Sequence, residues 1–301
     1  INLLLIQQLN KLTTQLNDGY SFTSDKDISM PDTMLDEAFG ELENGSVDYP
    51  QMIYDGPFSD ALINVSPKGL PNEEKGQEDG AAVLQNLGSL GLADIAYVNQ
   101  TEGQMVTFNY SYTTQNGVKG YAQVSQKGAK LILLDNMRML DNAELSVSQC
   151  VQIAEDFVKE VGLSDMHAVW QSDYQGYVYV NLAPILNDIV YYPDLVKVIV
   201  ARDTGEVLGY EAKSYYYNHV ERELPDYSST VMQARQKVFS KLNISSERLA
   251  LIPLSDGSEA LTFEFYGEYR NMKYFVYIDV VDLSEVNVLR VIDSENGALV
   301  L

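Results

Sequence analysis

Cysteine is almost absent from this chain, because Cys150 is the single one among 301 residues. One cysteine cannot form an intrachain disulfide, which excludes the disulfide-stapled scaffolds of small secreted proteins. Cys150 also falls on the apolar face of a predicted helix. We therefore expect it to be buried as a small apolar residue and not to act as a nucleophile.

Histidine is also scarce, and the common catalytic motifs are missing. The two histidines, His167 and His219, do not occur in the spacing of a metal-binding motif such as H-E-x-x-H. The sequence has no G-x-S-x-G elbow, no phosphate-binding loop and no dinucleotide fingerprint. We therefore predict no catalytic residues, no metal site and no cofactor, and we expect packing or pairing roles for both histidines. A pH-sensing role remains the alternative for His219.

Positive charge and long apolar runs are missing as well. There are 20 Lys and Arg residues against 43 Asp and Glu residues, so the net charge is −23. This balance offers no basic surface for a phosphate backbone, and we expect no nucleic-acid partner. No apolar run approaches the roughly 18 residues of a membrane-spanning helix. A basic partner or a cation-rich compartment fits the charge, although solubility alone would also explain it.

The chain begins with a predicted helix over residues 1–17. Leucines recur there at the spacing of one helical face, at Leu5, Leu9, Leu12 and Leu16. Ile1 extends this stripe backwards, so we interpret residues 1–17 as the end of an upstream helical region. A terminal helix packed on its own domain is the alternative. Residues 18–77 are rich in glycine and proline and are predicted to be an irregular linker region.

The rest of the sequence repeats one order of a helix followed by strands. The predicted helices cover residues 78–90, 146–161 and 229–242. The predicted strands cover 94–98, 104–112, 119–125 and 129–134, then 167–172, 176–182, 195–201 and 206–213, and finally 248–254, 260–266, 273–281, 286–292 and 298–301. This pattern predicts an α+β fold of three tandem units, 78–143, 144–226 and 227–301, each a helix on an antiparallel sheet.

Short turns punctuate the strands of these units. Asp203-Thr204-Gly205 lies between the last two predicted strands of the second unit, as a tight hairpin turn should. Asn296-Gly297 occupies the corresponding place in the third unit. We predict structural turns at Asp203, Thr204, Gly205, Asn296 and Gly297.

Two of these features resemble known families. A helix and a curled antiparallel sheet that ends in Asp203-Thr204-Gly205-Glu206-Val207 resembles a PepSY domain. The run YPQMIYDGPFSD at residues 49–60 resembles the hallmark of the spore germination protein YpeB family, which carries tandem PepSY units behind a membrane-anchored helical region. Ala61 stands where that family is expected to have a histidine, and the first unit lacks the Asp-Thr pair. These departures indicate a distant member.

The resemblance implies a function. It predicts a non-enzymatic spore protein that stabilises, localises or restrains a cortex-lytic peptidoglycan hydrolase of the SleB type, needed for germination. It implies a place in the spore at the outer side of the inner membrane or in the cortex, with membrane contact only through a region upstream of this chain. PepSY units also occur in propeptides, so the alternative is a peptidase inhibitor or propeptide-like chaperone acting on a metallopeptidase. The sequence leaves open whether the chain forms a homo-oligomer.

The candidate partner-binding residues are Tyr54, Asp55, Gly56, Pro57 and Phe58. Gly56 and Pro57 fix the backbone of a turn, and Asp55 could accept hydrogen bonds from its N–H groups. In the simpler interpretation, Tyr54 and Phe58 pack against the flank of a unit and Asp55 caps the turn. In the functional interpretation, this run forms part of the contact with the hydrolase.

Overall fold

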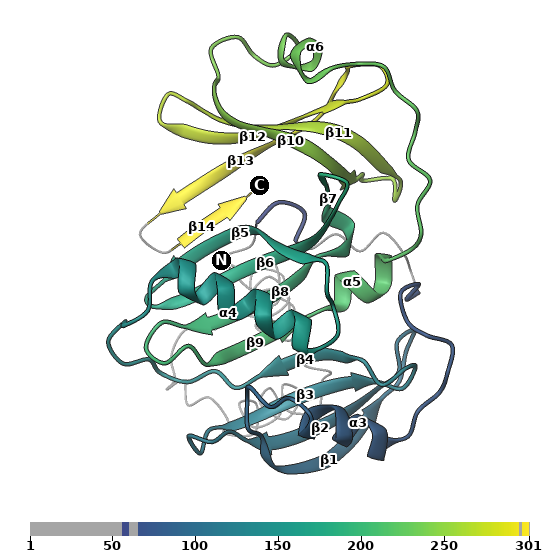
Figure 1. Ribbon diagram of the computed structural model, residues 1–301, viewed down its shortest axis with the longest axis vertical. Helices are drawn as coiled ribbons and strands as arrows, with labels where there is room; N and C mark the ends of the chain where they lie inside the picture. Colours follow the sequence, from purple (N-terminus) through teal and green to yellow (C-terminus); the bar gives the residue numbers. More distant parts are fainter. Residues whose placement is uncertain (1–55, 60–65, 295–296, 301) are drawn as a thin grey trace, which may run out of the picture. The chain divides into compact units, whose positions relative to one another are not determined.

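The strands that the structure describes form one continuous sheet that is almost entirely antiparallel (Figure 1). The computed structural model describes residues 56–59, 66–294 and 297–300, which all fall within one unit of the chain, residues 54–301. The helix predicted over residues 1–17 and the residues Tyr54, Asp55 and Asn296 lie outside the described residues. The class is mixed α and β, mostly sheet with few helices, as the alternation of elements predicts.

The first group of elements is a helix followed by a four-stranded meander. Its members are α3 (Gln77–Gln85), β1 (Ala93–Thr101), β2 (Thr107–Thr113), β3 (Lys119–Ser125) and β4 (Leu131–Asp135). Leu84 of α3 is fully buried, and its helix contacts all four strands. The helix is shorter than predicted. The chain turns after Gln85 and reaches Gly91 with a φ of +54°, which an α-helix cannot contain.

The second group has a longer helix and an additional hairpin. Its members are α4 (Val147–Glu160), β5 (Met166–Tyr174), β6 (Tyr177–Leu186), β7 (Ile189–Tyr191), the 3-10 turn η1 (Tyr192–Asp194), β8 (Val196–Ala201), β9 (Val207–Glu211) and α5 (Lys213–Asn218). Ser146 caps α4 by accepting a hydrogen bond from the backbone N–H of Gln149. Cys150 is fully buried on the inner face of α4, as its place in the apolar stripe predicts.

The third group is mostly strand. Its members are α6 (Val231–Arg235), β10 (Asn243–Pro253), β11 (Glu259–Tyr269), β12 (Met272–Asp279), β13 (Glu285–Ser294) and β14 (Gly297–Val300). The helix predicted over 229–242 is wrong beyond Arg235, where the chain continues in turns. Ala234 and Val238 are buried, but Phe239 is half exposed and packs edge-on against the ring of Tyr269. Tertiary contacts with the sheet have overridden the helical spacing.

Two ladders join the three groups of elements. Strand β4 pairs antiparallel with β9, which merges the first two groups at the register Leu134 to Tyr210. The hairpin of β6 and β7 turns at Asn187 and Asp188, which both have positive φ, as a two-residue type I′ turn requires. This hairpin lays β7 parallel to β10. The parallel pair was not predicted, since the strand pattern indicated antiparallel sheets alone.

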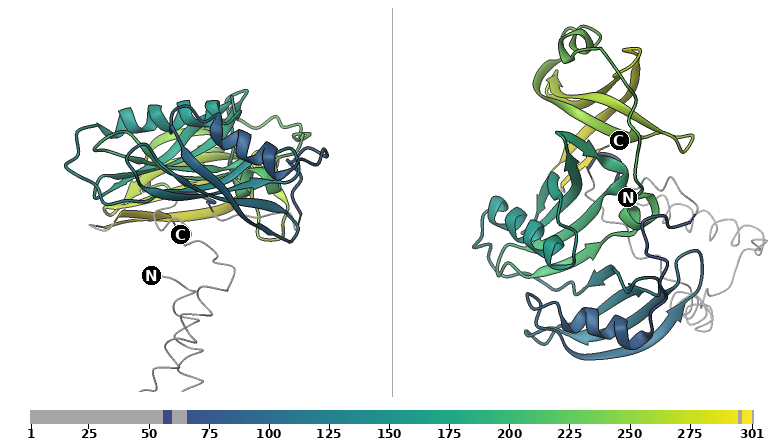
Figure 2. Two further views of the ribbon diagram at one scale, coloured as in Figure 1. Left: turned by 90° about the horizontal axis from the view of Figure 1, so that it is seen from below. Right: turned by 45° about the vertical axis from the view of Figure 1, so that its right-hand side comes forward.

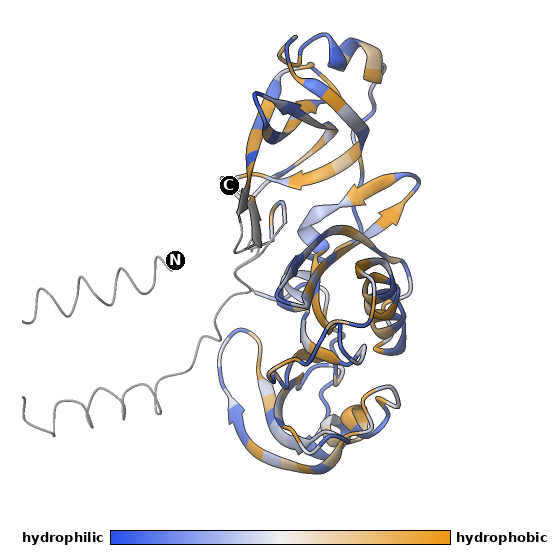
Figure 3. Cartoon of the chain, turned by 90° about the vertical axis from the view of Figure 1, so that its left-hand side faces the viewer, coloured by the Kyte–Doolittle hydropathy of each residue, from blue (hydrophilic) through white to orange (hydrophobic). Residues whose placement is uncertain are grey.

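The buried side chains do not divide into one cluster for each predicted unit. Helices α3 and α4 lie on the same face of the sheet (Figure 2), and a single cluster between them and the strands runs from Leu84 to Tyr216. Figure 3 shows hydrophobic residues, in orange, along these strands and on α4. In the third group the strands are buried on both faces. Val276 and Ile278 of β12 belong to one cluster, whereas Phe275 and Tyr277 belong to another on the opposite face.

We predict that Phe157→Ala lowers the free energy of unfolding by about 3–5 kcal/mol, because it leaves a cavity under α4. Phe157 is 2% exposed, and its ring packs edge-on against Tyr210 at 5.6 Å. Urea denaturation followed by circular dichroism measures the change. Met232→Ala is the control, since Met232 is 73% exposed and its loss should cost within about 0.5 kcal/mol. Equal effects of the two substitutions would contradict the packing described here.

Candidate functional site

The candidate run lies in a packed position wherever the structure describes it. Gly56, Pro57 and Ser59 are buried, and Phe58 is half-buried. Phe58 has a φ of +59°, a backbone conformation that residues with a Cβ atom rarely adopt. Such a conformation persists where the surrounding contacts hold it in place. Gly56, Pro57 and Phe58 therefore form an ordered turn against the sheet.

Gly56 makes the closest approach of this turn to the sheet. A Cβ atom added to Gly56 would lie 2.5 Å from Cγ and 2.6 Å from Cβ of Trp170, on strand β5. No side chain fits at that distance, so the backbone can cross the Trp170 side chain only at a glycine. The sequence predicted a turn at Gly56, but it did not predict this close contact with Trp170, which also requires a glycine.

Phe58 inserts its ring between two tyrosines from different groups of elements. Tyr192 belongs to η1 of the second group, and Tyr277 belongs to β12 of the third. The centroid of the Phe58 ring lies 5.3 Å from that of Tyr192 and 5.1 Å from that of Tyr277, both edge-on. Trp170 meets Phe275 of β12 in the same way at 6.1 Å. We call the aromatic cluster of Phe58, Trp170, Tyr192, Phe275 and Tyr277 the aromatic junction.

A charged network supports the aromatic junction from β10 and β11. The Tyr192 hydroxyl donates to Oε2 of Glu264 at 2.6 Å, and Nε of Arg248 donates to Oε1 of Glu264 at 2.6 Å. Nη2 of Arg248 also donates to the Tyr192 hydroxyl oxygen at 2.7 Å. Burial raises the pKa of Tyr192 well above its usual range, and the Glu264 carboxylate adds to the shift. The phenol therefore stays protonated and donates to Glu264, which is 3% exposed.

A second network fastens the connector that follows α5. Arg222 donates through Nη1 and Nη2 to both oxygens of Asp194, at 2.9 and 2.8 Å. It also donates through Nε and Nη2 to both oxygens of Glu259 on β11, at 2.7 and 2.8 Å. Asp194 is 1% exposed, and its Oδ2 lies 2.7 Å from Nδ1 of His219. The His219 ring stacks on Tyr215 at 4.5 Å. The expected pairing role of His219 is thus observed, and we call Asp194, Arg222 and Glu259 the clamp.

The predicted turn residues Asp203, Thr204 and Gly205 lie between β8 and β9. Gly205 has a φ of +79°, and its N–H donates to the carbonyl oxygen of Ala201. Arg138 reaches this hairpin from the segment between β4 and α4. Its Nη1 donates to Asp203 at 2.7 Å and its Nη2 to the Thr204 hydroxyl at 2.7 Å. In the third group, Gly297 begins β14 opposite Ser294.

Sequence reasoning missed the residues that join the groups. Arg138 and Arg222 each pair with carboxylates that lie far away in the sequence, and Arg248 reaches the distant hydroxyl of Tyr192. The one signal available was a lone arginine among acids, as in Glu221-Arg222-Glu223. Such an arginine must find a carboxylate partner if the fold buries it.

These two networks join segments of the fold through hydrogen bonds and ion pairs. The buried carboxylates of Asp194 and Glu264 each accept hydrogen bonds from an arginine. Among residues 56–59, 66–294 and 297–300, no group of three or more His, Cys, Asp and Glu side chains could hold a metal ion. No helix in the same residues is long and apolar enough to cross a membrane.

We predict that Gly56→Ala lowers the free energy of unfolding by about 1–3 kcal/mol, because its methyl group must displace Trp170. Trp170 is the single tryptophan of the chain, so its fluorescence reports on this site directly. The emission of the folded variant should shift as the indole moves.

The matched control for this substitution is Gly88→Ala. A Cβ atom at Gly88 meets nothing nearer than 3.7 Å, and that variant should keep both the emission and the stability of the parent chain. If Gly56→Ala behaved like Gly88→Ala, the close contact with Trp170 would be refuted.

We predict that Asp203 contributes stability that is lost in acid. Its hydrogen bond from Arg138 is the main cause that holds the pKa of this carboxyl well below its usual range. The contribution should be complete above the unfolded-state pKa of about 3.9 and should fall as the pH drops from there toward the folded-state pKa. Asp203→Asn should therefore be less stable at neutral pH, and its deficit should shrink between about pH 4 and pH 2. Chemical denaturation across pH measures this.

The control for the acid experiment is Asp226→Asn. Asp226 is exposed in the connector between α5 and α6, and it forms no hydrogen bond or ion pair with any residue the structure describes. Its replacement should leave the pH profile of stability unchanged. A deficit of Asp203→Asn that is independent of pH would contradict the role assigned to this carboxylate.

Known proteins are similar to this chain in sequence and in fold. The family described as YpeB sporulation, PepSY1 and PepSY2 domains matches residues 35–225. The chain is 29% identical over 175 residues to the sporulation protein YpeB of Halalkalibacterium halodurans, and 31% identical over 165 residues to that of Oceanobacillus iheyensis. These alignments cover 58% and 53% of this chain, but 39% and 36% of the two relatives. They thus span less than half of the length of either relative.

The solved structure of the Bacillus megaterium YpeB C-terminal domain has a similar fold. The two structures superpose with a TM-score of 0.63 at 21% identity, over 73% of this chain and 99% of the other. The family is not a known enzyme family. Its match covers more than half of the residues printed here, including the candidate run. This chain therefore belongs to the YpeB family of sporulation proteins, as the resemblance of the run at residues 49–60 predicts.

Proposed function

We propose that this chain is a non-enzymatic protein of the spore that stabilises, localises or restrains a cortex-lytic peptidoglycan hydrolase of the SleB type. Membership of a sporulation family is the observation that carries the proposal. It is supported by the buried ionisable groups of the aromatic junction and the clamp, which are engaged with one another and so serve the structure. On this proposal the chain would act by presenting surfaces to a partner.

We infer that the presenting scaffold consists of three PepSY-like units at 78–143, 144–226 and 227–301. Helices α3, α4 and α6 each precede a set of antiparallel strands, which supports this division. The first two units share one cluster of buried side chains, and the second and third are joined by the clamp and the aromatic junction. A partner would then meet three units whose contacts with one another are fixed.

The contact with the hydrolase is proposed to involve the run that contains Gly56, Pro57 and Phe58. Phe58 bridges Tyr192 and Tyr277, so the run holds the second and third units in one geometry. Residues next to this turn would meet the partner where that geometry is maintained. The strong negative charge of the chain, −23, favours a partner surface with basic residues.

The proposed location follows from the proposed partner. A cortex-lytic hydrolase acts on the peptidoglycan of the spore, so its companion would lie at the outer side of the inner membrane or in the cortex. Membrane attachment would come from a region upstream of this chain.

The test is the level of the hydrolase in spores of the organism that encodes this chain. We predict that deleting the gene lowers the hydrolase several-fold in dormant spores, measured by immunoblot, because the unpartnered enzyme is lost. Returning the unaltered gene should restore the level. The purified chain, incubated with spore peptidoglycan, should release no muropeptides.

Two results would overturn the proposal. An unchanged hydrolase level in the deletion strain would remove the partner role. Steady release of muropeptides by the purified chain would show that the chain is an enzyme, provided that a substitution in the chain abolishes the release.

A further inference from the structure

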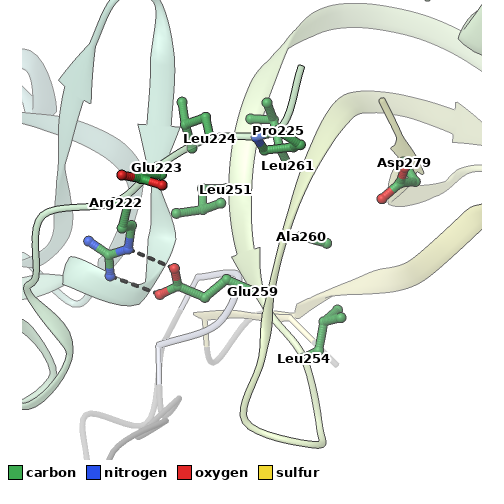
Figure 4. Close-up of a pocket in the computed structure, with 10 residues that line it drawn as sticks. All are labelled: Arg222, Glu223, Leu224, Pro225, Leu251, Leu254, Glu259, Ala260, Leu261 and Asp279. Carbon is green, nitrogen blue, oxygen red and sulfur yellow. Dashed lines mark hydrogen bonds and ion pairs between the residues drawn. The ribbon is translucent and has the colours of Figure 1, made fainter. Parts of the chain in front are cut away.

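A pocket of about 400 Å³ lies beneath the connector between α5 and α6. One wall is the connector itself, and the other walls come from β10, β11 and the end of β12 (Figure 4). Its size falls in the range of about 300–1,000 Å³ that is usual for sites that enclose a ligand. It is separate from the aromatic junction, although Arg222 and Glu259 of the clamp form part of its lining.

The walls of this pocket are mainly aliphatic. Leu251 on β10 and Leu261 on β11 form its floor and are buried, and Leu224 faces them from the connector. Figure 4 draws these three side chains near one another, beside the connector and the strands. A ligand must therefore offer an aliphatic group of its own to displace water from the pocket.

The connector offers backbone groups beside these walls. Residues 219–230 have no helix or strand, and no backbone group of residues 223–228 hydrogen-bonds to another residue that the structure describes. An extended peptide laid along the connector could pair with these N–H and C=O groups as an added strand does. The pocket is thus suited to a peptide more than to a compact small molecule.

The charges of the pocket exclude an anionic ligand. Arg222 is the one cationic side chain in its lining, and all of its N–H groups already have acceptors. Besides its bonds to Asp194 and Glu259, Arg222 donates hydrogen bonds to the carbonyl oxygens of Asn218 and Val220. A carboxylate or phosphate would find no free donor on this arginine.

The remaining acids of the pocket favour a cation. Glu223 is exposed and forms no hydrogen bond or ion pair with a described residue. Asp279 accepts backbone N–H bonds from Val281 and Asp282 through Oδ1. These two carboxylates lie on opposite sides of the drawn residues, with the leucines between them (Figure 4). A basic side chain next to an aliphatic one could therefore pair with a carboxylate on either side of the leucines, with Glu223 or with Asp279.

We propose that this pocket binds an extended peptide segment in which a basic residue stands next to an aliphatic residue. The segment belongs to a partner protein, and the inference does not depend on that partner being a cell-wall hydrolase. The leucines would hold the aliphatic side chain, Glu223 would pair with the basic one, and the connector backbone would fix the direction of the peptide.

The test uses the purified chain and the peptide acetyl-Leu-Arg-Leu-amide in isothermal titration calorimetry. The neutral peptide acetyl-Leu-Gln-Leu-amide is the comparison, and it should bind at least about fivefold more weakly because it lacks the charge. Binding of the basic peptide should weaken as salt is raised from about 0.05 M to about 0.5 M.

Glu223→Lys and Glu221→Lys form a matched pair of variants. Both residues are exposed, two positions apart in the connector, but only Glu223 lines the pocket. Glu223→Lys should weaken binding of the basic peptide at least about fivefold, whereas Glu221→Lys should change the affinity for this peptide less than about twofold. Both variants should melt at the temperature of the parent chain, since neither side chain has a described partner.

Three results would overturn the proposal. The first is no heat of binding with the basic peptide up to about 10 mM. The second is equal affinity for the basic and the neutral peptide. The third is equal weakening by the two variants, which would show that the net charge of the chain attracts the peptide and that the pocket does not hold it. None of these results bears on the hydrolase level in spores, so each proposal can fail alone.

Discussion

The carboxylate of Asp194, in η1 of the second group of elements, is buried almost completely, and an isolated charge could not remain there. Arg222 neutralises it from the connector and also holds Glu259 on β11, so one guanidinium ties three segments together. Removing one partner of such a buried pair typically costs about 3–5 kcal/mol. The path of the connector, and with it the pocket beneath the connector, depends on this clamp.

The continuous sheet also fixes the three groups of elements to one another across the described residues. The β4–β9 ladder merges the cores under α3 and α4, and the parallel β7–β10 ladder carries the sheet into the third group. The aromatic junction fills the space on the opposite face, where Phe58 meets Tyr192 and Tyr277. A turn from the hallmark run of the YpeB family thus has a place inside the packing, next to the contact between two proposed units.

This architecture suits a protein that acts through its surfaces. The charged groups inside are consumed in holding segments together, whereas the acidic exterior and the connector pocket remain available to a partner. The proposed role beside another protein would require a fixed arrangement of surfaces. The two proposals place those surfaces at the hallmark run and at the connector.

The sequence by itself determined the class of the fold, helix α4 with its cap at Ser146, most of the strands, and the family. These features depend on local periodicity, on capping residues and on a run of twelve residues, all of which are contained in short windows. The tertiary structure alone decided the shared core of the first two groups, the parallel β7–β10 pair, the early end of α6, the carboxylate partners of Arg138 and Arg222, and the contact of Arg248 with Tyr192. Each of these depends on which distant segments meet, and a local pattern carries no information about a partner that lies far along the chain.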